Sequence, residues 1–142
     1  MKNRMKWFLI LVSVGLLGFC FWMYLQIDHP VSIGEKLTGL DIPSRTKSIH
    51  FKRESNDFNG DGYMLIVLSL DNKDVGYVER QCVDNGYMDL KKSKLEDEPM
   101  MAKFYDRGDA GLWKVIEKTS ETYTIAFLNK SKNRLIVYSL NQ

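Results

Sequence analysis

The chain has 142 residues, of which 44% are hydrophobic and 27% are charged, and its formal net charge is +2. This length suits one folded domain with an appendage and excludes a large multidomain enzyme. The share of apolar and aromatic residues excludes a disordered chain. Basic and acidic residues are nearly equal in number, so the sequence predicts no nucleic acid partner.

Residues 7–25 form a stretch without any charged side chain. As a helix rising about 1.5 Å per residue it would reach roughly 28 Å, close to the ~30 Å hydrocarbon core of a bilayer. Trp7 at one end and Trp22 with Tyr24 at the other suit the two membrane interfaces. The sequence therefore predicts a basic cytoplasmic tail over residues 1–6 and a transmembrane anchor over residues 7–25.

The orientation of this anchor follows from the charges around it. Lys2, Arg4 and Lys6 precede the apolar stretch, and the segment after it holds few basic residues. By the positive-inside rule, the N-terminus is cytoplasmic and the rest of the chain is extracytoplasmic. We expect a single-pass protein of the cell membrane.

Three fates of the leader are open: retention, cleavage as a signal peptide, and lipidation at Cys20. The apolar stretch is longer than a usual signal-peptide core, and no pair of small residues marks a cleavage site after it. Phe19 stands directly before Cys20, where a lipoprotein signal has a small residue. These features favour a retained anchor.

Residues 26–46 contain Pro30, Gly34, Gly39 and Pro43 without a sustained period, which predicts a stalk. The domain then covers residues 47–142. Its first strand, 48–54, alternates apolar and polar residues and is predicted to be half-buried, with His50 on the polar side. The next strand, 63–70, is nearly continuously apolar and is predicted to be central.

A helix is predicted from Asp71 or Asn72 to about Asp84, with Val75, Val78 and Cys82 on its buried face and Asn85-Gly86 as its stop. A mixed-charge loop over 91–98 precedes a second short helix, which Pro99 opens and which places Met100 and Phe104 on one face. Strands are predicted over 112–118, 122–128 and 134–140, the last two joined by the hairpin loop 129–133. The predicted fold class is α+β, an antiparallel sheet of about five strands with two short helices on one face.

No catalytic motif occurs in the sequence: it lacks a P-loop, G-x-S-x-G, H-E-x-x-H and G-x-G-x-x-G. Only His29 and His50 could act as the general base that a nucleophile needs. The domain itself has one histidine and one cysteine, too few to form a zinc site. Cys82 is interpreted as a small buried hydrophobic residue. We therefore expect no enzyme and no required cofactor.

One motif has metal-ligand spacing. Asp57, Asn59 and Asp61 match the first oxygen positions of a calcium loop, and Gly62 matches its turn glycine. The closing position holds Leu68 in place of a glutamate, so we expect weak calcium binding at best. The alternative interpretation, which we favour, is a structural turn built on Gly60 and Gly62.

The same stretch carries a resemblance. Residues 58–62, Phe-Asn-Gly-Asp-Gly before an apolar strand, resemble the F-x-G-D-G segment of small uncharacterised membrane-anchored or lipoprotein-like proteins of Gram-positive bacteria. The end of the chain is similar too, through Gly111-Leu112-Trp113 and the strands 123–127 and 135–138. Residues 54–57 depart from the glycine and histidine often found before the motif. The resemblance implies an exported α+β domain and no activity.

These observations favour a membrane-anchored, non-catalytic domain that binds a protein partner, for example as an immunity factor does. The first alternative is a sensor of calcium or a small ligand that uses the loop 57–62. The second is a hydrolase whose site is not visible in the sequence.

Overall fold

The computed structural model describes residues 2–25, 29–55, 61–89, 103–106 and 108–141, and within the first helix it describes the side chains of residues 6 and 12–22. These residues form helices and the strands of one sheet. The helices are α1 (Lys2–Leu25), α2 (Pro30–Thr38) and α3 (Asn72–Asp84). The strands are β1 (Lys47–Ser55), β2 (Gly62–Ser69), β3 (Met88–Asp89), β4 (Gly111–Lys118), β5 (Thr122–Asn129) and β6 (Arg134–Asn141).

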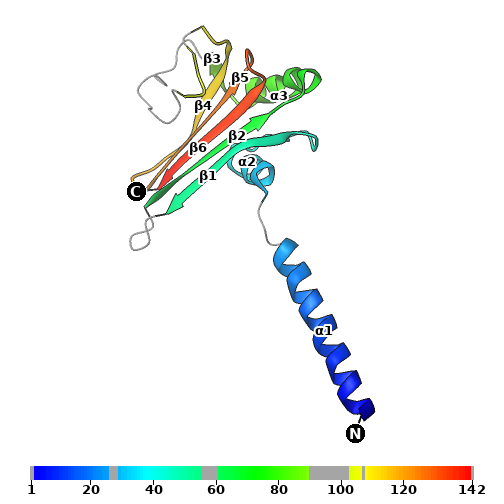
Figure 1. Cartoon of the computed structure of the whole chain (residues 1–142). Coiled ribbons are helices and arrows are strands. Elements are labelled where there is room, and N and C mark those ends of the chain that lie inside the picture. Colours follow the sequence, from blue (N-terminus) through cyan, green and yellow to red (C-terminus); the bar gives the residue numbers. More distant parts are fainter. Residues whose placement is uncertain (1, 26–28, 56–60, 90–102, 107, 142) are drawn as a thin grey trace.

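The strands make one six-stranded antiparallel sheet in the order β1-β2-β6-β5-β4-β3 (Figure 1). β6 lies between β2 and β5, so the C-terminal hairpin is central. β1 and the two-residue β3 form the edges. The predicted α+β class with an antiparallel sheet is confirmed, although β3 brings the strands to six where about five were expected.

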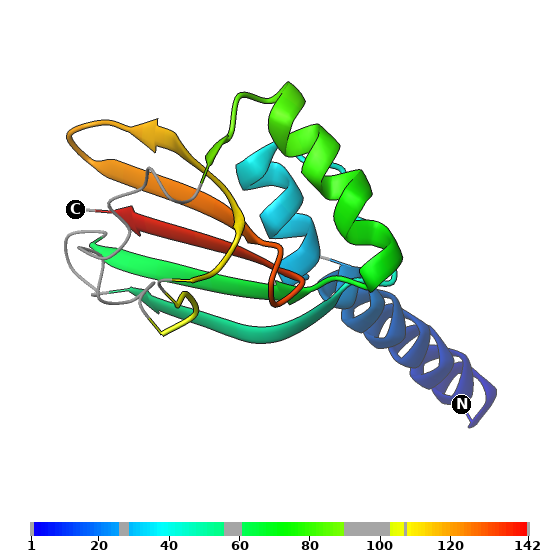
Figure 2. The ribbon, with the colours of Figure 1, turned by 90° about the horizontal axis from the view of Figure 1, so that it is seen from above.

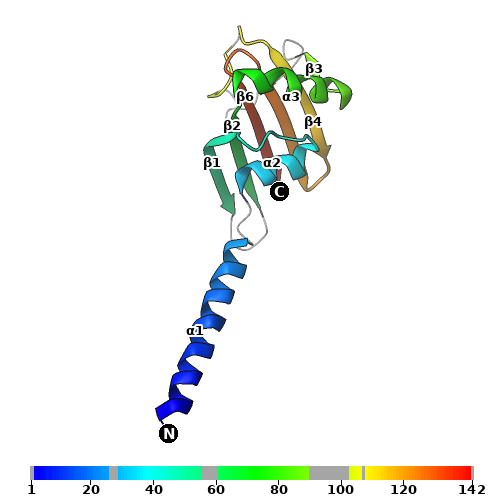
Figure 3. The ribbon, with the colours of Figure 1, turned by 90° about the vertical axis from the view of Figure 1, so that its right-hand side faces the viewer.

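Both short helices cover the same side of the sheet (Figures 2 and 3). On this helix-side face, Val78 and Cys82 of α3 are buried against the apolar side chains of β2, β5 and β6. Leu40 and Ile42, which follow α2, are 2% and 3% exposed in the same core. The helices thus bury one apolar face of the sheet.

The opposite face of the sheet holds a second core. Leu65, Ile125, Phe127 and Ile136 are buried there, and Phe104 and Tyr105 of the segment before β4 pack against them, together with half-buried side chains of the sheet. The central strands are therefore covered on both faces, which explains why residues 63–70 are almost all apolar.

The strand and helix predictions for the domain are largely confirmed. β4, β5 and β6 match their expected bounds within a residue, and β1 and β2 match theirs as closely. α3 begins after Asp71 and ends before Asn85, with Gly86 in the left-handed conformation at its stop. Val75, Val78 and Cys82 are buried as predicted.

The predicted stalk is wrong for residues 30–46. Pro30 begins α2, Gly39 ends it at a φ of 67°, and Ile33 and Leu37 pack on the helix-side core. A proline at the first position and a glycine after the end are normal helix boundaries. In the sequence alone, Pro30 and Gly39 are typical of a linker, because the helix between them is only nine residues long. The folded body therefore includes α2.

Two further predictions need correction. β1 is exposed along its whole length, and Ile49 and Phe51 are 49% and 42% exposed, because a strand at the sheet edge has a neighbour on one side only. The short helix expected from Pro99, with Phe104 on one face, begins on residues 99–102, which lie outside the described part. Phe104 is in a turn and packs on the face opposite the helices.

α1 is a continuous helix that lies apart from the sheet in Figures 1 and 3. Its described side chains include exposed apolar residues such as Leu16, Leu17 and Phe21. The transmembrane helix expected over residues 7–25 is not confirmed, since no helix among the described residues has the length and apolarity needed to cross a membrane.

Candidate functional site

The helix-side face of the sheet changes character along its strands. In the middle of the strands, Phe51, Ile66, Val137 and Ala126 lie side by side in one cross-strand row. Residues paired in this way point to the same face, two residues along each strand. This row is apolar and, apart from Phe51, buried.

The next two rows on the same face are mostly polar. The first holds Arg53, Met64, Ser139 and Thr124, and the second holds Ser55, Gly62, Asn141 and Thr122. Polar residues thus recur at a spacing of two on β1, β5 and β6, and the antiparallel register brings them together. Glu117 on β4 ends the first row beside Thr124. At about 4.8 Å per strand, its Cα lies roughly 19 Å from that of Arg53.

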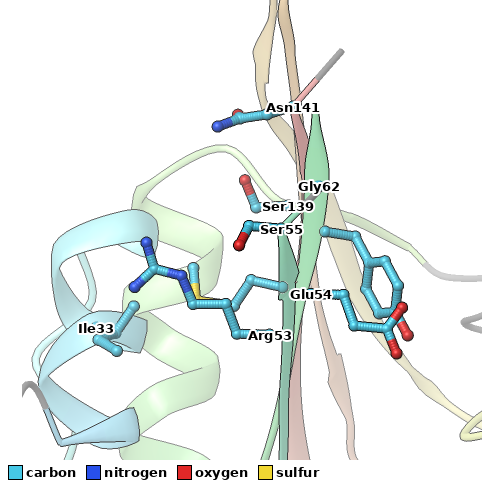
Figure 4. Close-up of a pocket in the computed structure, with 9 residues that line it drawn as sticks. Ile33, Arg53, Glu54, Ser55, Gly62, Ser139 and Asn141 are labelled. Atoms are coloured by element: carbon cyan, nitrogen blue, oxygen red, sulfur yellow. The ribbon is translucent and has the colours of Figure 1, made fainter. Parts of the chain in front are cut away.

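A pocket of about 200 Å³ opens over these polar rows (Figure 4). Figure 4 shows Arg53, Ser55, Ser139 and Asn141 on the side of the sheet that faces α2, and Glu54 on the other side. Ile33 of α2 forms the wall opposite the sheet. The residues that line the pocket are Ile33, Arg53, Glu54, Ser55, Gly62, Tyr63, Met64, Ser139 and Asn141.

The charge in the pocket comes from Arg53. Among the described residues, no carboxylate forms an ion pair with its guanidinium. On the other side of the sheet, Lys52 and Glu54 pair at 2.5 Å, and the hydrogen bond from Lys52 lowers the pKa of the Glu54 carboxyl. The acid beside the pocket is therefore already paired and points away from it.

The neutral polar groups of the pocket are only partly engaged. The hydroxyls of Thr124 and Ser139 share a hydrogen bond of 2.9 Å, and Thr124 is 1% exposed. At the rim, the hydroxyl of Thr122 donates to the side-chain oxygen of Asn141 at 3.4 Å. Within the described part of the chain, the amide nitrogen of Asn141 has no hydrogen-bond partner, and each serine hydroxyl has capacity for a further bond.

Gly62 closes the pocket where β1 and β2 meet. A Cβ placed on it would lie 2.3 Å from the carbonyl oxygen of Glu54 and 3.0 Å from the Cα of Ser55. Its φ is not positive, so a left-handed backbone is not the reason for glycine at this position. Glycine is required because the two strands approach closely.

The predicted calcium loop is largely untested. Asp57, Asn59 and Gly60 lie outside the described residues, and Asp61 directly precedes β2. Leu68, at the closing position of the motif, is fully buried in β2, so this position supplies no oxygen ligand for calcium. Within the described part of the chain, no three His, Cys, Asp or Glu side chains are placed to hold a metal ion.

The residues considered for nucleophilic chemistry do not meet. Cys82 of α3 is fully buried. Burial, together with the charge of Glu79, raises the pKa of its thiol to about 12. His29 precedes α2, while His50 lies on the opposite face with its ring 5.7 Å from that of Phe104. Neither imidazole contributes to the pocket.

The pocket borders an open sheet edge. All nine residues of β1 are exposed, and β1 has a neighbouring strand on one side only. Among the described residues, no turn or loop forms a backbone hydrogen bond with this strand. Arg53 and Ser55 belong to both features, so the pocket and the free edge form one continuous surface.

Other hollows are less suited to a ligand. A hollow of about 720 Å³ lies beside the start of α2, but Glu35 there accepts from the backbone N–H of Ile42 and Asp41 accepts from the hydroxyl of Tyr77. Its acids are thus already used within the fold. Hollows of about 360 and 400 Å³ lie at the turn over 118–123 and at residues 70–73.

The sequence analysis missed Arg53, Ser139 and Asn141 as site residues. The available signal was the pair of polar residues two positions apart at the ends of β1, β5 and β6. That signal has meaning only once the strand order is known, because β1 and β6 are far apart in the sequence.

Comparison of the chain with protein-family models, curated proteins and solved structures finds no match. The resemblance through residues 58–62 therefore stays a prediction. Function has to be inferred from the polar pocket and the free edge of β1.

Proposed function

We propose that the chain is a membrane-attached, non-catalytic module that binds an extended segment of a partner protein along the free edge of β1. The observation that carries this proposal is the edge strand itself, nine residues long and exposed throughout. A strand of this kind offers a row of backbone N–H and C=O groups that a partner strand can pair with.

The side chains of β1 support a specific interaction. Ile49 and Phe51 expose apolar surface on a strand whose neighbour β2 is largely buried. Exposed apolar residues on a long edge strand are a liability unless a partner covers them. Burial of a side chain such as Phe51 would contribute about 1.5–3 kcal/mol to binding before other costs.

The charges of β1 favour an acidic partner segment. The strand carries Lys47, Lys52 and Arg53 against Glu54 alone. Antiparallel pairing of two copies centred on Lys52 would place this lysine opposite itself, and a centre at His50 would place Lys47 opposite Arg53. Directly opposed like charges destabilise strand pairing, so these two registers are disfavoured for a second copy of the chain, whereas an acidic segment would meet opposite charges.

Attachment to the membrane is proposed from the sequence of residues 7–25. The described side chains of α1 cover only part of this stretch, and those that are apolar and large are exposed. A helix that exposes apolar side chains along its length is poorly suited to water. With the basic residues 2, 4 and 6 before it, the proposal places the sheet domain outside the cytoplasm.

The strand-binding proposal is tested with two peptides, one alternating valine with glutamate and one alternating valine with lysine. Binding to the full chain in lipid nanodiscs is followed by fluorescence anisotropy, and protection of the β1 amides by hydrogen exchange. We expect the acidic peptide to bind and to protect β1. Equal binding of both peptides, or binding without protection of β1, would contradict the proposal.

Matched variants locate the binding surface. Phe51→Ser should weaken binding of the acidic peptide about tenfold, because tenfold corresponds to about 1.4 kcal/mol, near the lower limit for a buried phenylalanine. Val83→Ser removes a side chain that is 58% exposed on α3, away from β1, and should leave binding unchanged. Equal loss in the two variants would show that the peptide does not use β1.

Membrane attachment is tested separately by alkaline carbonate extraction. We expect the full chain to stay with the membranes and a chain lacking residues 7–25 to be released. A reporter that is active only outside the cytoplasm, fused after Gln142, should be active. Extraction of the full chain, or activity of only a cytoplasmic reporter, would overturn the attachment or its orientation.

A further inference from the structure

We infer that the pocket between α2 and the end of the sheet is a binding site for a carboxylate group, with Arg53 as the counter-charge and Ser55, Ser139 and Asn141 as additional donors. The site rests on these side chains and does not require strand addition at β1.

The donor set determines the ligand charge. On the α2 side of the sheet the lining residues provide one guanidinium, two hydroxyls and one amide, and no acid. Arg53 has no carboxylate partner among the described residues, while the neighbouring cation Lys52 does. A guanidinium presents paired N–H groups that match the two oxygens of a carboxylate.

Size and lining exclude larger and more highly charged ligands. A volume of about 200 Å³ holds the equivalent of roughly seven waters at ~30 Å³ each. Sites for drug-sized ligands occupy about 300–1,000 Å³. A single cation balances a single negative charge, and the apolar Ile33 and Met64 make desolvation of a phosphate dianion costly. A carboxylate on a short aliphatic stem fits these limits.

The register shows that the polar side chains are gathered for a purpose other than packing. Arg53, Ser139 and Thr124 follow an apolar row on the same face and stand beneath α2 at Ile33. On the opposite face, the residues at the same level are aromatic or aliphatic in β2, β5 and β6. In β5 and β6 the polar residues are therefore confined to the face that carries the pocket, while β1 is polar on both faces.

The carboxylate has two possible sources with the same chemistry. It belongs either to a free small acid or to an acidic side chain of a segment bound along β1. The second source depends on the proposed function, because Arg53 lies on that strand. The first source does not.

Propionate is the probe for the free acid. It is titrated into the isotope-labelled full chain in nanodiscs, and the Arg53 Nε–H and the Asn141 side-chain amide are followed by NMR. We expect saturable shifts of both groups at concentrations on the order of millimolar. Arg53→Gln should weaken binding about tenfold or more. The matched control Lys52→Gln removes a neighbouring charge on the other face and should leave the affinity unchanged.

The second probe is the acidic peptide, which is compared with a copy in which glutamine replaces every glutamate. If propionate alone shifts Arg53, the site takes a free acid; if only the acidic peptide does, the carboxylate comes from a partner. Phe51→Ser separates the two proposals, because it should weaken the peptide and spare propionate. No shift of Arg53 with either probe, or equal losses in Arg53→Gln and Lys52→Gln, would overturn the inference.

Discussion

The two faces of the sheet differ most at the end where β1 leads into the pocket. On the helix-side face, this end carries Arg53, Ser139 and Asn141. On the opposite face, Tyr63 of β2 and Leu140 of β6 pack into the second core, while β1 carries the paired charges of Lys52 and Glu54. In β6 the two faces therefore differ at the same level, so exposure at the strand end does not explain the polarity of Ser139 and Asn141.

This difference shows that the opposite face is closed by a core at this end of the sheet, while the helix-side face is open at the pocket. The opposite face is closed by side chains of the sheet and by Phe104 and Tyr105. The helix-side face is closed by α2 and α3 only over its apolar part, and α2 leaves polar side chains uncovered at the pocket. Burying polar groups costs free energy unless they are hydrogen-bonded, which makes their retention there informative.

The largest expected effect tests the opposite face as a core. Phe127 is fully buried there and packs edge-on against the ring of Tyr105 at 6.4 Å. Phe127→Ala should lower the free energy of unfolding by about 3–5 kcal/mol, because it leaves a large cavity. Denaturant unfolding measures this change. A loss below about 1 kcal/mol would mean that this face is not a packed core.

The second prediction concerns the close approach of β1 and β2. Gly62→Ala should destabilise the domain by about 1–3 kcal/mol, because the added Cβ meets backbone atoms of Glu54 that cannot move independently. Gly76→Ala is the control: it lies in α3 with open space around its Cβ position and should be neutral or stabilise by up to about 1 kcal/mol. Equal effects would show that crowding at Gly62 is relieved cheaply.

The third prediction concerns the core beneath α3. Cys82→Ala should cost about 1–2 kcal/mol, since it removes a buried sulfur and leaves a small cavity. In the native protein a thiol reagent should modify Cys82 slowly, and in denaturant quickly. Rapid labelling of the native protein would show that this side of α3 is not packed against the sheet.

The same thiol predicts a pH dependence. Burial raises its pKa from the ordinary 9.0 to about 12, so the folded state favours the protonated form. The stability that Cys82 contributes is complete below pH 9 and is lost as pH rises through 12. Cys82→Ala should remove this part of the alkaline destabilisation, as measured by unfolding at several pH values.

The smallest expected effect tests whether the polar pair Thr124 and Ser139 on the helix-side face contributes to folding. Ser139→Ala should cost about 1 kcal/mol, because it leaves the buried hydroxyl of Thr124 without its 2.9 Å partner. Adding Thr124→Val should restore the loss. If the double variant matches or exceeds the native protein in stability, the polar pair is not kept for folding. A double variant less stable than either single variant would assign the pair a structural role.

Much of the fold could be predicted from local sequence. β4, β5 and β6 are short segments rich in β-branched and aromatic residues separated by turns, and α3 has buried residues at helical spacing. The exposure of β1 could not be predicted, because alternation reveals which side chains share a face but not whether anything covers that face. The strand order decides that question.

The candidate site was less accessible from sequence. Arg53 and Ser139 are 86 positions apart and become neighbours only through the pairing of β1 with β2 and β2 with β6. α2 was mistaken for part of a stalk, so the wall that Ile33 provides was also missed. The motif at 57–62, in contrast, can be recognised from the spacing of its residues in the sequence alone.

The pairing of β1 with β2 shifts register between Ser48 and His50. A bulge of this kind bends the strand and interrupts regular pairing on its outer side as well. A docked segment can therefore run straight only beside residues 50–55, a length of roughly 20 Å at about 3.3 Å per residue. The bulge thus limits the length that a partner strand could pair with to about six residues, beside residues 50–55, a stretch that includes Arg53.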